Sequence, residues 1–208
     1  MGRVDRMREF IKRVLMCISS VRLLPHFVLL VLTPRRDVIA KDLDRWGELV
    51  CRARPRTGPQ RLAVFVRLMT FNPEYRSLFY YRTGLPGIAL SFLCRPMPTL
   101  YIHTRKIGPG LFIQHGFATI IAAGEIGENC WINQQVTLGF TSLTDCPKLG
   151  NNVTISAGAQ VLGNVTIGDN AHVGANAVVV KNVPANCTVV GVPAYIVRKD
   201  GIKVRQDL

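Results

Sequence analysis

The feature that most constrains the fold is an aliphatic residue at every sixth position in the C-terminal half of the chain. The unbroken part of this series is Leu149, Ile155, Val161, Ile167, Val173 and Val179. Four residues after each member lies a small or β-branched residue, namely Val153, Ala159, Val165, Ala171, Ala177 and Val183. Neither a 3.6-residue helix nor a two-residue strand alternation produces this spacing. A fixed period of six is typical of a parallel β-helix, in which each hexapeptide forms one flat face of a coil.

The same series extends toward the N-terminus with two irregular steps. Its earlier members are Ile107, Ile113, Ile120, Ile126, Ile132 and Leu138, with a seven-residue step before Ile120. The eleven residues from Leu138 to Leu149 predict a hexapeptide with an inserted loop, at about 139–148, that projects from the coil. Residues 107–183 should form a little over four three-sided turns, with glycine and asparagine at many corners.

Three regions are predicted. Residues 1–100 lack the six-residue period and should be mainly helical, residues 101–190 should form the β-helix, and residues 191–208 should form a tail folded over its last turn. The fold class is therefore α+β, a helical region followed by a left-handed parallel β-helix. Helices are expected at 5–19, 38–52, 59–71 and 74–81, punctuated by prolines.

The N-terminus is strongly basic. Residues 1–36 hold eight Lys and Arg against two acidic residues, and the whole chain has 26 against 13. The apolar stretch 23–32, broken by Pro25 and His26, is shorter than the roughly 20 residues that span a bilayer. Two interpretations follow: peripheral contact with the anionic inner face of a cytoplasmic membrane, or core and oligomer contacts with a solvated basic rim. The lack of a basic stripe with interleaved aromatics argues against nucleic acid.

The cysteines and histidines limit the kinds of functional site that the chain could hold. The six cysteines are far apart and form no CxxC motif, which favours free thiols in a cytoplasmic protein without disulfides or a zinc site. Of the four histidines, His26 is expected to be structural and His172 to lie on the surface. His115 stands apart, because the repeat places it at or near a corner and Gly116 beside it allows close approach of another group.

Several segments in sequence order resemble the serine acetyltransferase branch of the hexapeptide-repeat acyltransferases. These segments are the one that contains His115, Val136-Thr137-Leu138-Gly139, Pro147-Lys148-Leu149, Ala157-Gly158-Ala159 and Gly191-Val192-Pro193-Ala194. The similarity covers about residues 101–199. It implies an acetyl-CoA-dependent O-acetyltransferase that works without a metal, forms a homotrimer or a dimer of trimers, and uses His115 as the general base.

The resemblance also implies how acetyl-CoA is bound. The backbone at Gly139, Ala157 and Ala175 would hold the pantetheine arm in a groove between neighbouring coils. Lys181, Arg198 and Lys199 are candidates for the phosphates, although each is equally explained as a solvated surface charge.

Around the acceptor, the chain departs from the family pattern. An aspartate that orients the base is replaced by tyrosine in Tyr101-Ile102-His103, a second aspartate is replaced by Gln114, and an Arg-His pair is replaced by Asp145-Cys146. These residues are candidates for catalytic support or acceptor binding, with the Tyr101 hydroxyl or a backbone carbonyl orienting His115. Cys146 is expected to pack or to shape the acceptor site, since no histidine near it in sequence could activate it.

The departures favour a different acceptor. The Cys-Pro step, the short loop and the basic helices resemble acetyltransferases of capsule and exopolysaccharide biosynthesis, whose acceptor is a sugar hydroxyl on a glycan or lipid-linked precursor. Serine acetylation is the alternative, and a non-catalytic β-helix assembly module is a third possibility, since a fold does not guarantee an activity. A metal hydrolase on this fold would need three converging histidines, and only His103 and His115 lie on the early turns.

Overall fold

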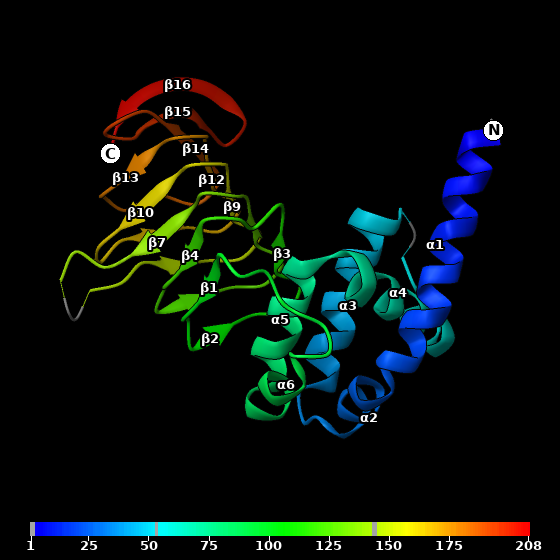
Figure 1. The fold of residues 1–208 in the computed structure, drawn as a ribbon. Coiled ribbons are helices and arrows are strands. Elements are labelled where there is room, and N and C mark those ends of the chain that lie inside the picture. The colour runs from blue at the N-terminus through cyan, green and yellow to red at the C-terminus, as the bar shows by residue number, and fades with distance from the viewer. Residues whose placement is uncertain (1–2, 53, 143–144) are drawn as a thin grey trace. The chain divides into compact units, whose positions relative to one another are not determined.

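The computed structural model describes residues 3–52, 54–142 and 145–208. The chain divides into two compact units, Met1–Pro96 and Met97–Leu208. The first unit is helical and the second is a coil of short strands (Figure 1). An N-terminal helical region followed by a parallel β-helix is the predicted fold class.

The helical unit contains two more helices than the sequence predicted. Its helices are α1 (Arg3–Arg22), α2 (Leu24–Leu32), α3 (Arg36–Cys51), α4 (Gly58–Phe71), α5 (Pro73–Thr83) and α6 (Leu85–Leu90). The two that were missed, α2 and α6, each carry a proline in the first turn, Pro25 and Pro86. Proline is tolerated there because a first-turn residue needs no intrahelical N–H donor, so these prolines mark where a helix begins.

Aromatic rings form the core of the helical unit. Trp46 of α3 packs edge-on against Tyr75 of α5 at 5.3 Å between ring centroids, and Phe65 of α4 packs likewise against Phe79 at 5.2 Å. All four side chains are fully buried. Edge-to-face pairs add about 0.5–1.5 kcal/mol each to the free energy of burying their surface.

A charged pair lies within this core. The guanidinium of Arg82 donates from Nε to Oδ2 of Asp42 at 2.9 Å and from Nη2 to Oδ1 at 3.3 Å. Both side chains are buried, with exposed fractions of 2% and 1%. The two-pronged geometry satisfies both carboxylate oxygens, which a buried charge pair requires if its mutual attraction is to offset the loss of hydration.

His26 is buried, as the sequence predicted for a structural residue. The Tyr80 hydroxyl donates to the Cys94 carbonyl at 2.8 Å, so it accepts from Nε2 of His26 at 3.0 Å. Nδ1 of His26 is buried and has no hydrogen-bond partner among the described residues. Burial, and to a lesser extent the charge of Arg22, lowers the pKa of His26 below its ordinary 6.5.

We expect the free energy of unfolding to decrease as the pH falls below about 6.5, because the unfolded chain then binds a proton that folded His26 does not. His26→Gln should flatten this part of the profile, measured by urea unfolding at a series of pH values. A slope at pH 5–6.5 that is identical in both proteins would contradict the assignment.

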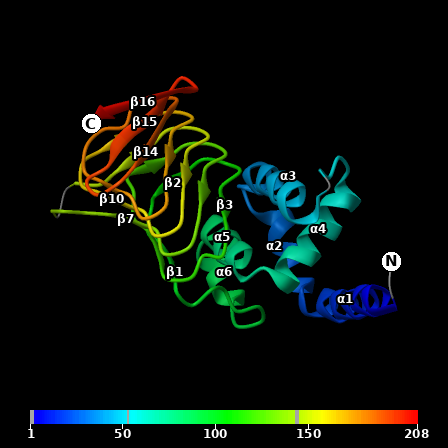
Figure 2. The same ribbon diagram turned by 90° about the horizontal axis from the view of Figure 1, so that it is seen from above.

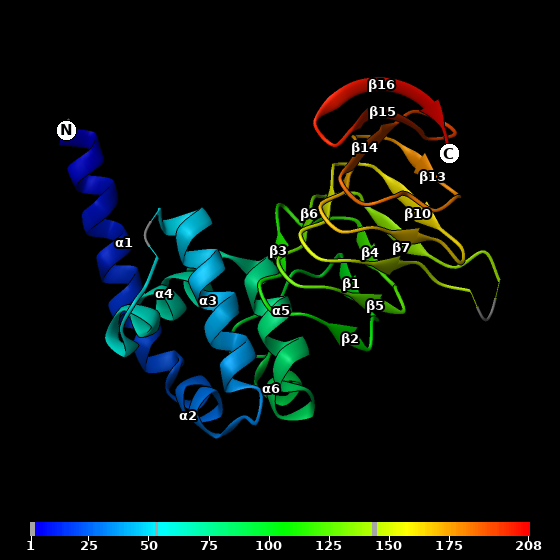
Figure 3. The ribbon, with the colours of Figure 1, turned by 180° about the vertical axis from the view of Figure 1, so that it is seen from behind.

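The second unit is a three-sided coil, whose strands stack in successive turns (Figure 3). One face is the sheet β1 (Leu100–Ile102), β4 (Thr119–Ile121), β7 (Thr137–Gly139), β10 (Gln160–Leu162) and β13 (Val178–Val179). The second is β2 (Lys106–Ile107), β5 (Glu125–Ile126), β8 (Lys148–Leu149) and β11 (Thr166–Ile167). The third begins with β3 (Phe112–Ile113), β6 (Trp131–Ile132), β9 (Thr154–Ile155), β12 (His172–Val173) and β14 (Cys187–Val190).

The end of the coil is closed by a hairpin. β15 (Tyr195–Lys199) pairs antiparallel with β14, and β16 (Ile202–Asp207) pairs antiparallel with β15. β1 and β14 add strands at the two ends of the coil. The coil therefore has about five turns, more than the little over four that the repeat in residues 107–183 predicted. The loop between β7 and β8 leaves the coil at the predicted place (Figure 2).

One position of the predicted repeat was wrong. Ile121, not Ile120, pairs with Ile102 and Leu138 in the neighbouring turns. Ile121 is fully buried, whereas Ile120 is 40% exposed and pairs with Tyr101 on the outer surface. Two adjacent isoleucines are equally apolar, so hydrophobicity could not choose between them. The step from Ile113 to Ile121 therefore has eight residues, two more than a hexapeptide.

Glycines make close stacking possible at the edge that leads from β2, β5, β8 and β11 to the third face. A Cβ on Gly127 would lie 2.5 Å from the carbonyl oxygen of Gly150 in the next turn, and one on Gly108 would lie 2.6 Å from the carbonyl carbon of Gly127. Asparagines at the same edge bond between turns, from Asn152 to Asn170 at 3.1 Å and from Asn170 to Asn186 at 2.9 Å. This edge is thus built for packing and stability.

Candidate functional site

A second edge of the coil, which we call the His115 edge, carries the candidate base. It consists of residues 114–118, 133–136, 156–159 and 174–177, which lead from the third face to the first. Main-chain bonds stack its turns: Gln135 N–H to Phe117 O at 3.0 Å, Gly158 N–H to Gln134 O at 3.0 Å and Asn176 N–H to Ala157 O at 2.9 Å.

His115 lies in a two-residue insertion at this edge. Each turn has a residue with positive φ three positions before its inward aliphatic residue: Ala118, Gln135, Gly158 and Asn176. His115 adds a further positive φ of 61° in the first of these turns. Non-glycine residues seldom adopt this conformation, and such strain is concentrated at functional sites. The insertion therefore places an exposed imidazole on a second strained backbone position, which the regular corners of this edge lack.

Neighbouring groups hold the insertion in place. The amide Nε2 of Gln114 lies 3.5 Å from Nε2 of His115, at the long limit of a hydrogen bond. The hydroxyl of Thr119, a fully buried residue, donates to the carbonyl of Phe117 at 3.1 Å. Gln114, predicted to support the base, is thus the residue whose side chain the structure places against it.

Tyr101 and His103 form a separate pair. Their rings are stacked, with centroids 6.2 Å apart and planes inclined by 10°. Tyr101 is on β1 and 51% exposed, and His103 begins the corner that leads to β2. The ring of Tyr101 therefore contacts that of His103. A hydrogen bond from Tyr101 to His115 stays a prediction.

The loop between β7 and β8 holds the two residues that replace the family's Arg-His pair. Asp145 accepts from the main-chain N–H of Thr141 and of Ser142, each at 2.8 Å, and from the Thr141 hydroxyl. These bonds, that from the Thr141 side chain foremost, lower the pKa of Asp145. Its carboxylate thus closes the loop on itself, so loop shape rather than direct acceptor contact is its evident role.

Cys146 packs against the coil at the base of this loop. A Cβ added at Gly124 in the preceding turn would lie 2.9 Å from its Sγ, and Gly124 N–H donates to Pro147 O at 2.9 Å. The loop leaves the edge between the first and second faces, whereas His115 lies at the edge between the third and first. Within one chain, a whole sheet face separates Cys146 from His115.

The predicted acetyl-CoA residues do not lie together. Ala157 and Ala175 lie on the His115 edge in successive turns above His115, and Ala175 is exposed. Gly139 lies at the end of β7, next to the loop. Arg198 and Lys199 are exposed at the far end of β15, about 13 Å along the strand from Tyr195.

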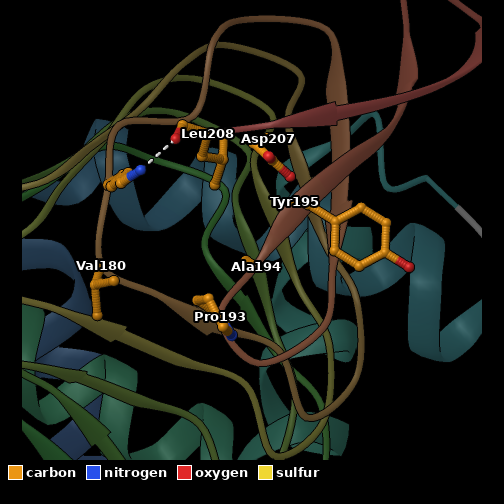
Figure 4. A pocket seen from close by; sticks show the side chains of 7 residues that line it. Val180, Pro193, Ala194, Tyr195, Asp207 and Leu208 are labelled. Atoms are coloured by element: carbon orange, nitrogen blue, oxygen red, sulfur yellow. Dashed lines mark hydrogen bonds between the residues drawn. The ribbon is translucent and has the colours of Figure 1, made fainter.

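Lys181 borders a pocket that the sequence did not predict. The pocket, of about 400 Å³, lies where the last turn meets the hairpin, and its lining residues are Val180, Lys181, Pro193, Ala194, Tyr195, Asp207 and Leu208. Nζ of Lys181 donates to the main-chain oxygen of Leu208 at 2.6 Å, the bond that Figure 4 draws as a dashed line to Leu208. Only chain folding brings Tyr195 and Leu208 to Lys181, so no sequence motif could have revealed this pocket.

A second histidine, His172, contacts the His115 edge two turns after the turn that holds His115. His172 is exposed on β12, as predicted, and its Nε2 lies 2.8 Å from the Ser156 hydroxyl. Partial burial lowers the pKa of His172. Among the described residues, no group of three or more His, Cys, Asp or Glu could hold a metal ion.

Comparison with known proteins finds a family match within the coil. Residues 146–181 match the bacterial transferase hexapeptide (six repeats) family. The chain is 43% identical over 131 residues to serine acetyltransferase of Synechococcus elongatus, covering 60% of this chain and 54% of that one. It is 46% identical over 123 residues to serine acetyltransferase of Staphylococcus aureus, covering 56% and 57%. The chain thus spans about half the length of these curated relatives.

A solved structure extends the likeness to the helical region. The crystal structure of Neisseria gonorrhoeae serine acetyltransferase in complex with serine has a TM-score of 0.63 and 28% identity, over 84% of this chain and 73% of that chain. The serine O-acetyltransferase structure from Brucella melitensis has a TM-score of 0.61 and 27% identity, over 84% and 72%.

These similarities contradict the prediction of a sugar acceptor. The relatives at 43% and 46% identity are serine acetyltransferases, so the assignment to capsule or exopolysaccharide biosynthesis is wrong. The prediction relied on charged residues that are missing at three positions. Their absence removes support for one acceptor without supplying a group that recognises another. The chain is similar to the hexapeptide-repeat transferases over residues 146–181, and to serine acetyltransferases over more than half of its length.

Proposed function

We propose that this chain transfers the acetyl group of acetyl-CoA to the hydroxyl of serine, with His115 as general base. The observation that carries the proposal is the position of His115, strained and exposed in an insertion on the same edge as Ala157 and Ala175. The homology to serine acetyltransferases supports the choice of donor and acceptor.

Acetyl transfer at this edge needs a base, hydrogen-bond donors for the oxyanion and a group that positions the base. The imidazole removes the proton of the serine hydroxyl while the hydroxyl oxygen attacks the carbonyl carbon of the thioester. The C–S bond then breaks, and the imidazolium returns the proton to the sulfur, so that CoA leaves as a thiol. Negative charge on the carbonyl oxygen needs donors placed in advance, and corner N–H groups that no neighbouring turn uses are suited to this. Gln114 would position the imidazole through its amide.

The His115 edge and the pocket each offer groups that could hold a part of acetyl-CoA. Small residues at Ala157 and Ala175 leave the main chain accessible to the pantetheine arm along the edge. Lys181, at the pocket, would offer its ammonium to a phosphate after releasing the oxygen of Leu208. Arg198 and Lys199, at the far end of β15, are weaker candidates for the same role.

The separation of His115 from the loop supports a shared site. In a trimer, the loop between β7 and β8 of one subunit would face the His115 edge of the next, with Cys146 and Asp145 shaping the acceptor side from across the boundary. Closed ring assembly with one repeated interface brings two different edges of the coil together, as this arrangement requires.

The proposal is tested by incubating the purified chain with acetyl-CoA and following thiol release with and without serine. Serine-dependent release is expected, with O-acetylserine identified by mass spectrometry. Retention of the chain on immobilised CoA without serine turnover would contradict serine as the acceptor, but it would also argue against the non-catalytic assembly module. A chain that neither binds CoA nor turns over serine would refute the proposed function.

A further inference from the structure

Helix α1 presents its apolar side to solvent. Eight large apolar side chains are 41–70% exposed: Val4, Met7, Phe10, Ile11, Val14, Leu15, Ile18 and Val21. At 3.6 residues per turn they fall within an arc of about 140°, which we call the α1 apolar face. Scattered exposed apolar residues need no explanation, but a continuous face of this size marks an interaction site.

The face points away from the unit to which the helix belongs. The side of α1 covered by its neighbours carries small or flexible residues, among them Met16, Ser19 and Ser20. Ser19 is the most buried of these, at 6% exposed. The N-terminal end of α1 stands clear of the other helices of the unit in all three views (Figures 1–3). An ordinary surface helix has the opposite arrangement, with its apolar side toward the core.

Basic residues border the α1 apolar face on both sides. The 3.6-residue period places Arg6 and Arg13 along one border and Arg8 along the other. The acidic residues Asp5 and Glu9 fall on the opposite side of the helix, and Glu9 is paired with Lys12 at 2.8 Å. The surface that faces outward therefore combines apolar side chains with a rim of positive charge.

We propose that α1 lies on the surface of an anionic lipid bilayer, with the α1 apolar face among the acyl chains and its arginines at the headgroups. The acyl chains of such a bilayer match the apolar side chains, and its anionic headgroups match the arginines. A second copy of α1 fits less well, because pairing two such faces would bring like-charged arginine rims together. Leu24, Val28 and Val31 of the next helix, α2, are also exposed.

This is contact with one leaflet and not a span. Among the described helices none is long and apolar enough to cross a membrane alone, although α1 and α2 pass by length and composition as a pair bent by 66°. The inference is independent of the proposed acetyl transfer.

The test is cosedimentation of the full chain with vesicles of phosphatidylcholine alone or mixed with phosphatidylglycerol. Binding is expected only with the anionic lipid and should weaken as salt is added. Ile11→Glu with Ile18→Glu should reduce the partition coefficient about 100-fold or more, because each glutamate removes a large apolar contact. Arg6→Gln and Arg13→Gln should each reduce it about fivefold.

The matched control is Leu85→Glu with Phe92→Glu, two residues of the same unit that are 82% and 73% exposed. It should bind as the wild type does, and circular dichroism should show equal helix content in all variants. The proposal is overturned if the wild type ignores anionic vesicles, or if the Ile11/Ile18 variant sediments like the wild type. If the wild type ignores vesicles while that variant forms smaller assemblies in ultracentrifugation, a second copy covers the face instead.

Discussion

Replacing His115 by alanine is expected to lower kcat for serine acetylation by about 10²–10⁴, the usual contribution of a positioned general base. The hydroxyl of serine is a poor nucleophile until its proton is removed, and the imidazole of His115 is the group that the insertion at this edge exposes. Thiol release from acetyl-CoA at saturating serine measures the effect. Retention on immobilised CoA should persist, because the proposed contacts with the pantetheine arm lie on other turns of the edge.

The matched control is His172→Ala, which also removes an exposed imidazole from the coil but lies on β12 and bonds to Ser156. Its turnover should equal that of the wild type. Should both variants lose activity alike, the loss reflects damage to the coil. Should His115→Ala retain full turnover, another group removes the proton and the proposed base is wrong.

Breaking the buried pair of the helical unit has the largest expected effect on stability. Asp42→Ala should lower the free energy of unfolding of this unit by about 3–5 kcal/mol, because it leaves the charge of Arg82 buried without its carboxylate partner. Urea unfolding followed by far-ultraviolet circular dichroism, which reports mainly on α1–α6, measures the change.

Two comparisons separate this effect from the general cost of a mutation. Arg61→Met removes the partner of Asp44 in a bidentate pair whose side chains are 37% and 19% exposed, and should cost only about 0–1 kcal/mol. Asp42→Leu combined with Arg82→Met should be less destabilising than Asp42→Ala alone, since no charge is left unpaired. A double variant that is as unstable as the sum of the single variants would show that the pair is not coupled.

Periodicity revealed the coil but not its irregularities. The small residues of the repeat, such as Ala159 and Ala177, are fully buried, as the pattern predicted. The choice between Ile120 and Ile121 required strand pairing, because both residues have the same side chain. That one-residue difference matters, since it reveals the two extra residues in which His115 lies.

In the helical region, local sequence signals were enough to predict most of the helices. Thr57 and Gln60 form a capping box at the start of α4, which a sequence can show. The partnership of Asp42 with Arg82, 40 residues apart, cannot be read from spacing. Neither can the outward direction of the α1 apolar face, because a helical period identifies an apolar side without saying what covers it.

The sequence by itself determined that residues 149–179 stack as hexapeptides, because only a six-residue coil buries every sixth aliphatic residue in one column. It also singled out His115 as a candidate base. The tertiary structure alone decided where that base stands relative to other groups: on one edge with Ala157 and Ala175, and across a sheet face from Cys146. The physical reason is that the period fixes which residues face inward, whereas corner insertions and strand register fix which outward residues meet.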